Sequence, residues 1–357
     1  MNVMIMAGGT GGHIYPAAAV ANQLQERGHT IRWLGSSYGM EGKLVPEMGY
    51  EFCALPVTAW HGSRLRKVLA PFNLIRALWH CMFIFRREQP DVVIGFGGYA
   101  SAPGGIAALL TRRKLLLHEQ NGVPGLTNAR LAGRADRVLQ AFPDTFSGSV
   151  EVVGNPVRNA LCQLSSPDKR GLGTHRNLRV LVLGGSQGAV AINQLVPAAV
   201  SQLSQGSVEI WHQTGAGKQH ETEAAYRDLS LEATVVEYID RMDEAYRWAD
   251  LVIARSGAST VSELAAVGVY SLLIPYPWHK DQQQYRNARW LADNQAANWF
   301  DQQELTPDRL AAELIALNKD RKKLQAGAKR AWQIGIRDSA ERVARVAEEL
   351  ISKQEVS

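Results

Sequence analysis

The segment AGGTGGH, residues 7–13, places four glycines and a histidine directly after a short apolar run. Glycine adopts positive φ angles easily and lets a ligand approach the backbone closely. Where such a turn opens a helix, free N–H groups and the positive end of the helix dipole form a binding site for phosphate. Beside that terminus the dipole favours a neutral imidazole, which can accept a proton. We therefore expect His13 to be either a general base or a histidine that only hydrogen-bonds to the loop.

Three further glycine-rich segments follow apolar runs in the same way: GFGGYASAP (95–103), LGGSQGA (183–189) and ARSGAST (254–260). In doubly wound sheets, ligands bind where strands end and helices begin. One such turn is weak evidence, since tight turns need glycine in any case. Four of them in one chain favour a ligand that carries phosphate.

Two common nucleotide-binding motifs fail. Counting G-x-G-x-x-G from Gly9 puts Ile14 at the last glycine position, and the next strand pattern ends at Gly35 and Ser36 without an acidic residue for a ribose. The segment GAGKQ carries Gln219 where an ATP-binding loop needs serine or threonine. NAD and P-loop sites are therefore disfavoured, and a nucleotide-sugar diphosphate remains compatible.

Several polar residues have side chains that can bind sugars. Thr260 and Glu263 have the spacing of a capping box, so Glu263 either satisfies a backbone N–H at a helix start or holds ribose hydroxyls. The glutamines at 282–284 can read sugar hydroxyls, because a primary amide both donates and accepts hydrogen bonds. A solvated polar helix face is the alternative for them. Asn121 and Asn128 in the first half present the same choice.

These residues need a scaffold, and the sequence indicates a parallel α/β fold. Helical patterns at 17–27, 189–203 and 261–267 lie between continuously apolar runs, which favours parallel sheets with helices on both faces. Ten strands are too many for one sheet of typical size. The predicted strands are 3–7, 30–34, 92–95, 114–118, 137–140, 179–183, 208–213, 234–237, 251–254 and 271–275.

The chain restarts near its middle. The segment LRVLVLGGSQGAVAINQL (178–195) repeats the layout of the opening, and LSSPDKRGLGTHRN before it has the composition of a linker. We place a domain boundary near residue 160. The last amphipathic segment, Ser339–Ser352, could close either domain.

Composition sets limits on the class of protein. The 357 residues are 46% hydrophobic, enough for large cores, and the three distant cysteines form neither a metal motif nor a disulfide framework. These features, without a visible secretory signal or spanning segment, are typical of a cytosolic protein. Basic residues exceed acidic ones by six in residues 1–160, while the rest of the chain has one more acidic than basic residue. The first half therefore has either an anionic partner or ordinary solvated charges.

Seven segments in one order together resemble the MurG family of bacterial glycosyltransferases: AGGTGGHIYPA, GFGGYASAPG, HEQNGVPGLTN, VVGNPVR, LGGSQGA, ARSGASTVSE and HKDQQQYRNA. The resemblance spans nearly the whole chain. It implies the GT-B architecture, in which two Rossmann-like α/β domains with parallel sheets face each other across a cleft. Residues 1–160 would bind the acceptor and the membrane, with 337–357 packing back on them, and 161–336 would bind UDP-N-acetylglucosamine.

The resemblance also implies the reaction. N-acetylglucosamine would move from UDP to the C4 hydroxyl of an undecaprenyl-pyrophosphoryl N-acetylmuramyl-peptide, with inversion, in peptidoglycan synthesis. The enzyme would be peripheral, on the cytoplasmic face of the inner membrane, at an anionic lipid surface. No cofactor, metal or nucleic acid would be required. The absence of an Asp-x-Asp motif fits a helix start at Ser259 and Thr260 that stabilises the leaving UDP.

Individual roles follow from the same match, with His13 at the position of the candidate base. The donor-binding positions are Thr10, Gly11, Gly12, Asn121, Arg158, Ser186, Ile239, Ala258, Ser259, Thr260, Val261, Ser262, Glu263, Gln283 and Gln284. The acceptor-side positions are Gly98, Tyr99, Ser101 and Asn128.

The chain departs from the family at two points. Tyr270 stands where the family commonly has proline, which puts a loop conformation in doubt. The run Gln282-Gln283-Gln284 leaves open which two glutamines touch the sugar. Two other functions share this architecture: a UDP-N-acetylglucosamine 2-epimerase, which needs no lipid surface, and a non-catalytic sugar-nucleotide-binding protein.

The segment PFNLIRALWHCMFIFRR predicts a helix between Pro71 and Pro90. Four of its polar residues, Asn73, Arg76, His80 and Arg87, fall on a narrow arc. The apolar surface is therefore far wider than the stripe of roughly 100° that packing on one sheet requires. Burial under a neighbouring loop is one explanation. Membrane attachment is the other, because basic residues that suit anionic lipids flank the stretch, namely Arg64, Arg66, Lys67, Arg86 and Arg87. The expected membrane patch is Ile75, Trp79, Met82, Phe83 and Arg86.

Overall fold

The computed structural model describes residues 1–57, 64–185 and 187–352, with only the helical backbone described for 64–71. The chain divides into two compact units. Unit 1 comprises Met1–Arg158 and Arg337–Ser357, and unit 2 comprises Asn159–Ile336.

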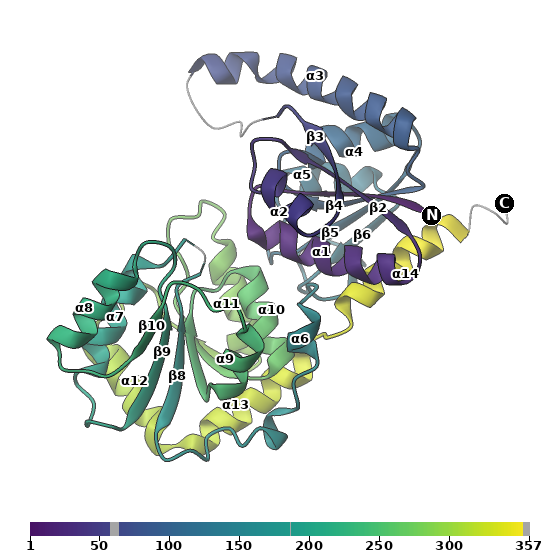
Figure 1. Cartoon of the computed structure of the whole chain (residues 1–357). Helices are drawn as coiled ribbons and strands as arrows, with labels where there is room; N and C mark the ends of the chain where they lie inside the picture. The colour runs from purple at the N-terminus through teal and green to yellow at the C-terminus, as the bar shows by residue number, and fades with distance from the viewer. Residues whose placement is uncertain (58–63, 186, 353–357) are drawn as a thin grey trace. The chain divides into compact units, whose positions relative to one another are not determined.

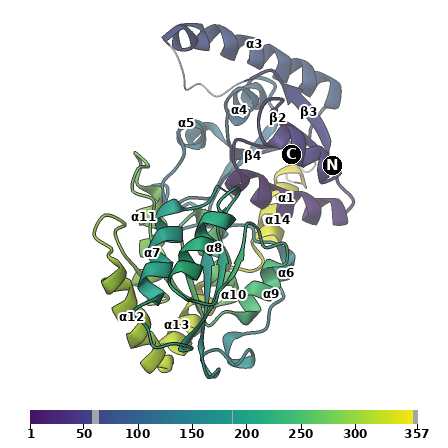
Figure 2. The same cartoon turned by 60° about the vertical axis from the view of Figure 1, so that its left-hand side comes forward.

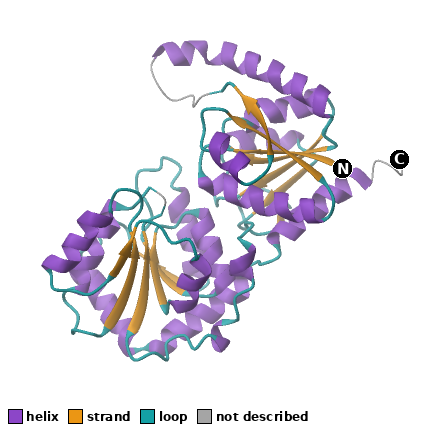
Figure 3. Cartoon of the chain, in the orientation of Figure 1, coloured by secondary structure: helices purple, strands orange, loops and turns teal. Residues whose placement is uncertain are grey.

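Within its described residues, unit 1 contains one parallel sheet of seven strands in the order β3-β2-β1-β4-β5-β6-β7 (Figure 1). Neighbouring residues of β1 face opposite cores, with Val3 and Ile5 in one apolar cluster and Met4 and Met6 in the other. Both faces are covered by helices (Figure 3), which is why the central strands are apolar throughout. The strands are β1 (Asn2–Ala7), β2 (Thr30–Ser36), β3 (Glu51–Leu55), β4 (Val92–Gly97), β5 (Lys114–Glu119), β6 (Arg137–Gln140) and β7 (Glu151–Val152).

The helices of unit 1 divide between the two faces of this sheet. One face packs on α1 and α14, whose Ile14, Leu24, Val343 and Ala347 share a core with it, and the other packs on α3 and α4. The helices are α1 (Gly11–Glu26), α2 (Glu41–Glu47), α3 (Arg64–Glu88), α4 (Ser101–Leu110), α5 (Leu126–Leu131) and α14 (Ser339–Ser352), and a 3₁₀ turn covers Ala132–Arg134.

The C-terminal helix α14 belongs to unit 1 and lies against α1 (Figure 1). Glu348, near the C-terminal end of α14, holds this helix on unit 1. The carboxylate of Glu348 accepts hydrogen bonds from Arg27 Nη1 at 2.9 Å and from His29 Nε2 at 2.8 Å. The chain therefore leaves unit 1, builds unit 2 and returns.

Helix α3 runs along the outside of unit 1 in both views (Figures 1 and 2). Its described side chains form two apolar faces. Ala77, Cys81, Ile84 and Phe85 are buried against the sheet side, and Met82 is half-buried against the same core. A second stripe points to solvent, with exposed fractions of 66% for Phe72, 55% for Ile75, 67% for Trp79 and 67% for Phe83. Burial under a neighbouring loop is therefore wrong for this stripe. Arg86 is exposed, and the side chains of Arg64, Arg66 and Lys67 lie outside the described ones.

Unit 2 repeats this architecture. Its described residues form one parallel sheet in the order β10-β9-β8-β11-β12-β13, with helices on both faces and α7 beside α8 (Figure 2). The strands are β8 (Leu178–Leu183), β9 (Val208–Gln213), β10 (Thr234–Val236), β11 (Leu251–Ala254), β12 (Tyr270–Leu273) and β13 (Ala297–Trp299). The helices are α6 (Asn159–Cys162), α7 (Val190–Val200), α8 (Gln219–Asp228), α9 (Met242–Trp248), α10 (Ala258–Val267), α11 (Gln283–Asp293), α12 (Pro307–Lys319) and α13 (Arg321–Ile334), with a 3₁₀ turn at Pro167–Lys169. The predicted fold class, two α/β units with parallel sheets, is confirmed.

Tyr270, the departure from the family pattern, is the first residue of β12 and is buried. Its ring packs over Gly327 in α13, where an added Cβ would lie 2.1 Å from Tyr270 Cδ2. The tyrosine is therefore accommodated by a glycine on the helix above it.

Candidate active site

Two glycine loops of unit 1 meet where the winding of the sheet reverses, between β1 and β4. Ligands of open α/β sheets bind at such a switch point, outside the carboxyl ends of the strands. Gly98 has a φ of 95°, and a Cβ built on it would lie 2.4 Å from the carbonyl oxygen of Gly8. The loop after β4 therefore lies directly on the loop after β1, and only glycine permits this approach.

His13 lies in the first turn of α1, with its imidazole held from one side. Nδ1 lies 3.1 Å from the carbonyl oxygen of Gly8, and because a carbonyl only accepts, Nδ1 carries the proton of the neutral ring. Nε2 keeps its lone pair and faces Gly97, where an added Cβ would lie 3.1 Å from it. The ring is thus oriented with its basic nitrogen at the switch point.

The surroundings of His13 set its protonation state. Burial lowers the pKa of His13 below its ordinary value, while the Glu119 carboxylate, the hydrogen bond to Gly8 and the Glu41 carboxylate act in the opposite direction. The imidazole is therefore neutral at pH 7 and able to accept a proton at Nε2.

Thr10, Gly11 and Gly12 form the start of α1. Thr10 is the N-cap, in extended conformation, and Gly11 and Gly12 already belong to the first helical turn. The N–H groups of a first turn have no carbonyl partner within their helix, so they can bind an anion. The helix thus begins earlier than the predicted 17–27.

The acceptor-side residues Tyr99 and Ser101 follow β4. The half-buried Tyr99 ring lies 3.9 Å from where a Cβ of Gly9 would stand. Ser101 is buried, with Oγ 2.8 Å from the Gly97 carbonyl oxygen and 3.2 Å from that of Met6. Ser101 therefore joins the ends of β1 and β4, from which the two glycine loops start.

Asn121 and Asn128 lie around the carboxylate of Glu119, at the end of β5. Glu119 accepts hydrogen bonds from the N–H of Asn121 at 3.0 Å, the N–H of Gly125 at 3.0 Å and Asn128 Nδ2 at 2.9 Å. Glu119 and Asn128 are buried, and Asn121 is half-buried. The Asn128 amide therefore shapes this loop, and Asn121 is the more accessible of the two amides.

In unit 2 the winding reverses between β8 and β11, and the glycine loop after β8 is again held tightly. Gln213 is buried; its Oε1 accepts from the N–H of Gly185 at 3.0 Å, and its Nε2 donates to the carbonyl of Glu237 at 2.7 Å. An added Cβ on Gly188 would lie 2.4 Å from the carbonyl oxygen of Thr214. Ser186, predicted to lie near the diphosphate, falls outside the described residues.

Helix α10 follows β11, the second of the two strands at this switch point. Its N-cap is Gly257, and no side chain caps it, so the capping-box alternative for Thr260 and Glu263 is wrong. Instead Glu263 Oε2 accepts a hydrogen bond from the hydroxyl of Tyr246 at 3.0 Å. Ser259 Oγ is buried, and no hydrogen-bond partner for it exists among the described residues.

The remaining donor positions differ in exposure. Ala258, Val261 and Ser262 are buried in α10, Thr260 is half-buried and Arg158, the last residue of the first segment of unit 1, is exposed. Ile239 is half-buried in the loop after β10, and within the described part of the chain its backbone makes no hydrogen bond.

The glutamine run lies at the start of α11, and its members have different contacts. Gln282 is the N-cap with a φ of 50°, Gln283 Nε2 lies 3.0 Å from His279 Nδ1, and Gln284 Oε1 accepts from the N–H of Tyr276 at 2.9 Å. Ser256 Oγ donates to the carbonyl of Gln284 at 2.8 Å, which joins this loop to the one after β11.

Sequence reasoning missed the residues that shape these loops, namely Glu41, Glu119, Gln213, Tyr246 and Arg255. Arg255 donates to the carbonyls of Ile274 at 2.9 Å and Pro275 at 3.3 Å, so it ties the loop after β11 to the end of β12. Glu119 and Gln213 are polar residues at the carboxyl ends of apolar strands, a signal that could have identified them. Glu41 and Tyr246 carry no such local signal.

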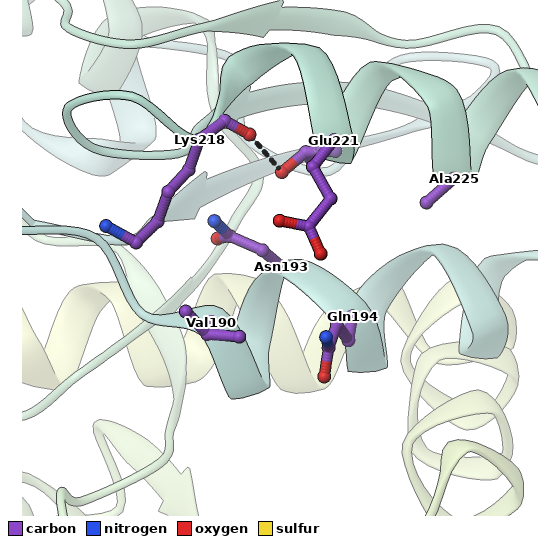
Figure 4. Close-up of a pocket in the computed structure, with 7 residues that line it drawn as sticks. Val190, Asn193, Gln194, Lys218, Glu221 and Ala225 are labelled. Carbon is purple, nitrogen blue, oxygen red and sulfur yellow. Dashed lines mark hydrogen bonds between the residues drawn. The ribbon is translucent and has the colours of Figure 1, made fainter.

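A small pocket in unit 2 lies between α7 and α8 (Figure 4). Its volume is about 60 Å³, and it is lined by Val190, Asn193, Gln194, Lys218, Glu221, Thr222 and Ala225. Ligand pockets usually measure about 300–1,000 Å³, so this one is too small for a sugar nucleotide. Within the described ranges, no group of three histidine, cysteine or acidic side chains is placed to hold a metal ion.

Comparison with known proteins shows to which family this fold belongs. A family model of the glycosyltransferase family 28 N-terminal domain matches residues 3–140, and one of the C-terminal domain of that family matches residues 179–349. The two sheets with their glycine loops are thus those of a two-domain glycosyltransferase.

Individual relatives show to which member of glycosyltransferase family 28 the chain is similar. A protein of Aliivibrio fischeri, 48% identical over 98% of each chain, and one of Alcanivorax borkumensis, 46% identical over 98% of each chain, are both named UDP-N-acetylglucosamine--N-acetylmuramyl-(pentapeptide) pyrophosphoryl-undecaprenol N-acetylglucosamine transferase. The crystal structure of Acinetobacter baumannii MurG is 36% identical, with a TM-score of 0.87 over 98% of this chain and 99% of that one. The chain belongs to the MurG family of N-acetylglucosamine transferases, within glycosyltransferase family 28.

Proposed function

We propose that this chain transfers N-acetylglucosamine from UDP-N-acetylglucosamine to the C4 hydroxyl of an undecaprenyl-pyrophosphoryl N-acetylmuramyl-peptide. The named relatives support the two substrates. The single observation that supports the chemistry best is the imidazole of His13, held by Gly8 through Nδ1 with its basic Nε2 at the switch point of unit 1.

The bonds of this reaction balance without any other reactant. The acceptor oxygen attacks the anomeric carbon while the bond from that carbon to the UDP oxygen breaks, which inverts the configuration. His13 Nε2 takes the hydroxyl proton. The electron pair of the broken bond leaves on UDP, and the N–H groups at the start of α10 stabilise its charge.

Unit 2 supplies most of the donor-binding residues of this proposal. Glu263, held by Tyr246, would accept hydrogen bonds from the ribose hydroxyls, and Ser259 Oγ would find its missing partner in a diphosphate oxygen. The free backbone groups of Ile239 can pair with the uracil edge. Two of the glutamines at 282–284 would hold the hydroxyls of the sugar.

Helix α3 supports attachment of the enzyme to the cytoplasmic face of the inner membrane. Phe72, Ile75, Trp79 and Phe83 are spaced three and four residues apart and are all more than half exposed, so they form one apolar stripe. An exposed apolar stripe beside basic residues is suited to an anionic lipid surface. Across the described residues, no helix has the length and apolar character needed to span a bilayer.

The test is transfer of labelled N-acetylglucosamine from UDP into butanol-extractable lipid. The proposal expects label in the lipid only when the lipid-linked muramyl-peptide is supplied. Formation of UDP-N-acetylmannosamine without any lipid acceptor would identify a 2-epimerase instead. UDP binding with neither product would identify a non-catalytic binding protein.

A further inference from the structure

Glu41 is a carboxylate with no exposed surface, at the first position of α2. Among the described residues no lysine, arginine or histidine forms an ion pair with it. Burying a charge costs free energy unless hydrogen bonds compensate. The role of Glu41 must therefore be sought in the groups that bind its oxygens.

Two backbone N–H groups from neighbouring strand ends bind this carboxylate. Glu41 Oε2 accepts from the N–H of Gly9 at 2.9 Å, and Oε1 accepts from the N–H of Ser36 at 3.0 Å. Because β1 and β2 are parallel neighbours, Glu41 joins the loop after β1 to the end of β2. Hydrogen bonds to an ionised acceptor are the stronger kind.

Glycines from three segments surround the same carboxylate. An added Cβ would lie 2.2 Å from Glu41 Oε1 at Gly8, 2.3 Å from Oε2 at Gly39 and 2.7 Å from Cγ at Gly35. Any larger residue at these positions would displace the side chain. The chain thus provides a cradle in which the carboxylate has one position.

One peptide group connects Glu41 with His13. The N–H of Gly9 and the carbonyl of Gly8 belong to the same peptide bond; the N–H donates to Glu41, and the carbonyl accepts from His13 Nδ1 at 3.1 Å. Linked hydrogen bonds polarise one another, so a carboxylate on the N–H makes the carbonyl a better acceptor. On its other side Gly98 packs closely against Gly8, since an added Cβ at Gly98 would lie 2.4 Å from the Gly8 carbonyl oxygen.

We propose that Glu41 is the positioning residue of His13, acting through the peptide group between Gly8 and Gly9. It holds that peptide so that the carbonyl of Gly8 faces Nδ1, which leaves Nε2 as the proton acceptor. The arrangement resembles the carboxylate that orients a catalytic histidine directly, with one peptide inserted between the two groups.

The charge of Glu41 contributes as well as its shape. Burial lowers the pKa of His13, and the charged groups that oppose this are Glu119 and Glu41. Removal of the Glu41 charge would therefore lower the pKa further and make Nε2 a weaker base. A purely structural glutamate would leave the titration of His13 unchanged.

The proposal rests on His13 being the base, so the experiment separates the two claims. The first readout is ¹⁵N NMR of the histidine rings in the free protein, with His13 assigned from its loss in His13→Gln. The second is kcat, the KM for the donor and the pH profile of kcat/KM. The variants are Glu41→Gln and Glu41→Asp, with Glu47→Gln, exposed on the same helix, as the control.

In Glu41→Gln we expect a lower pKa for His13, an acid limb of kcat/KM moved to lower pH, and a kcat reduced about 10–100-fold. The KM for the donor should stay within about twofold, because the residues proposed to bind its uracil, ribose and diphosphate lie in unit 2. Glu41→Asp keeps the charge, so its His13 should titrate closer to the parent, and Glu47→Gln should match the parent throughout.

Three outcomes would overturn the proposal. They are a Glu41→Gln protein whose His13 titrates as in the parent, whatever its kcat; a Glu47→Gln protein that shifts as much as Glu41→Gln; and an Nε2–H tautomer of His13 in the parent. The tautomer needs no variant, so it decides the matter even if Glu41→Gln fails to fold. A shifted titration together with full activity of His13→Gln would support the link and refute the base.

Discussion

The hydroxyl of Tyr246 in α9 donates a hydrogen bond of 3.0 Å to Oε2 of Glu263 in α10. Tyr246 is fully buried, while Glu263 is half-buried, so the tyrosine holds a carboxylate that is still partly exposed. The capping role for Glu263 is wrong, and ribose binding remains the proposal for it.

We therefore expect Glu263→Gln to raise the KM for UDP-N-acetylglucosamine and to leave the melting temperature nearly unchanged. Loss of a helix cap would cost about 0.5–2 kcal/mol of stability instead. Tyr246→Phe should raise the same KM by a smaller factor, because it keeps the charge but releases the carboxylate. A Glu263→Gln protein of parental KM would exclude ribose binding.

His13→Ala should lower kcat by a factor on the order of 10²–10⁴, the usual contribution of a general base. Calorimetric affinity for UDP should survive, since the proposed binding of UDP is centred in unit 2. In the parent, kcat/KM should fall toward acid with a midpoint below about pH 6.5, because burial lowers the pKa of His13. Near-normal kcat in His13→Ala would mean that the base lies elsewhere.

Gly97→Ala should impair catalysis beyond its effect on stability. Its φ of 102° is unfavourable for alanine, and its Cβ would lie 3.1 Å from Nε2 of His13, so the ring must shift. We expect a loss of about 1–2 kcal/mol of stability and at least about a tenfold lower kcat. Gly28→Ala is the matched control: its φ is 82°, but no atom lies within 4 Å of the new Cβ. It should lose similar stability and keep kcat, and equal kcat in both variants would contradict the prediction.

Two buried histidines should make the protein acid-sensitive. Burial lowers the pKa of His118 to about 4 and that of His212 to about 3. In the unfolded chain a histidine has a pKa of about 6.5, so below that pH the unfolded chain binds protons while the buried histidines stay neutral. The contribution of these histidines to stability is therefore complete above about pH 6.5 and is lost as the pH falls toward their folded-state pKa values. Each histidine should contribute a slope of up to about 1.4 kcal/mol per pH unit in that window.

Urea unfolding at pH 7.5 and 5.5 measures this slope. His118→Gln and His212→Gln should each flatten this slope, because glutamine does not titrate. The glutamine amide can still donate in place of Nε2–H, which bonds to the Gly154 carbonyl at 2.9 Å in His118 and to Asn193 Oδ1 at 3.1 Å in His212. His80→Gln, at an exposed site on α3, is the control. Unchanged slopes in both buried variants would remove burial as the cause.

Replacement of Trp79 and Phe83 by glutamate should reduce co-sedimentation with anionic liposomes while UDP binding and the melting temperature are retained. Both side chains are 67% exposed, so the double variant loses little packing. Leu229→Glu, which alters an exposed apolar residue of unit 2, should sediment as the parent does. High salt should weaken attachment only in part, since part of it is apolar. Parental sedimentation of the double variant would show that α3 is not the anchor.

The sequence predicted the interior of both sheets better than their edges. All ten predicted strands exist, whereas Glu51–Leu55, Glu151–Val152 and Ala297–Trp299 were missed. Each of these three strands lies at the edge of its sheet. Edge strands are short or only partly buried, as in β3, so they lack the continuous apolar run that marks an inner strand.

The site was predictable where a residue acts beside its own loop. His13 was found because it directly follows the glycines that hold it. Glu41 could not be found in this way, because its partners Gly9 and Ser36 meet only when β1 and β2 pair. The capping box at Thr260 failed for a related reason, since the helix starts three residues earlier, with Gly257 as its N-cap, and Tyr246 from another helix binds Glu263.

The return of α14 to unit 1 has a consequence for synthesis on the ribosome. The face of α1 that carries Ile14 and Leu24 shares its core with Val343 and Ala347 of α14, which are synthesised after unit 2. Unit 2 is a single uninterrupted segment, so it can finish folding while unit 1 still waits for its final helix. A nascent chain stalled after residue 336 should therefore hold a protease-resistant unit 2 and a protease-sensitive unit 1, although the latter was made first.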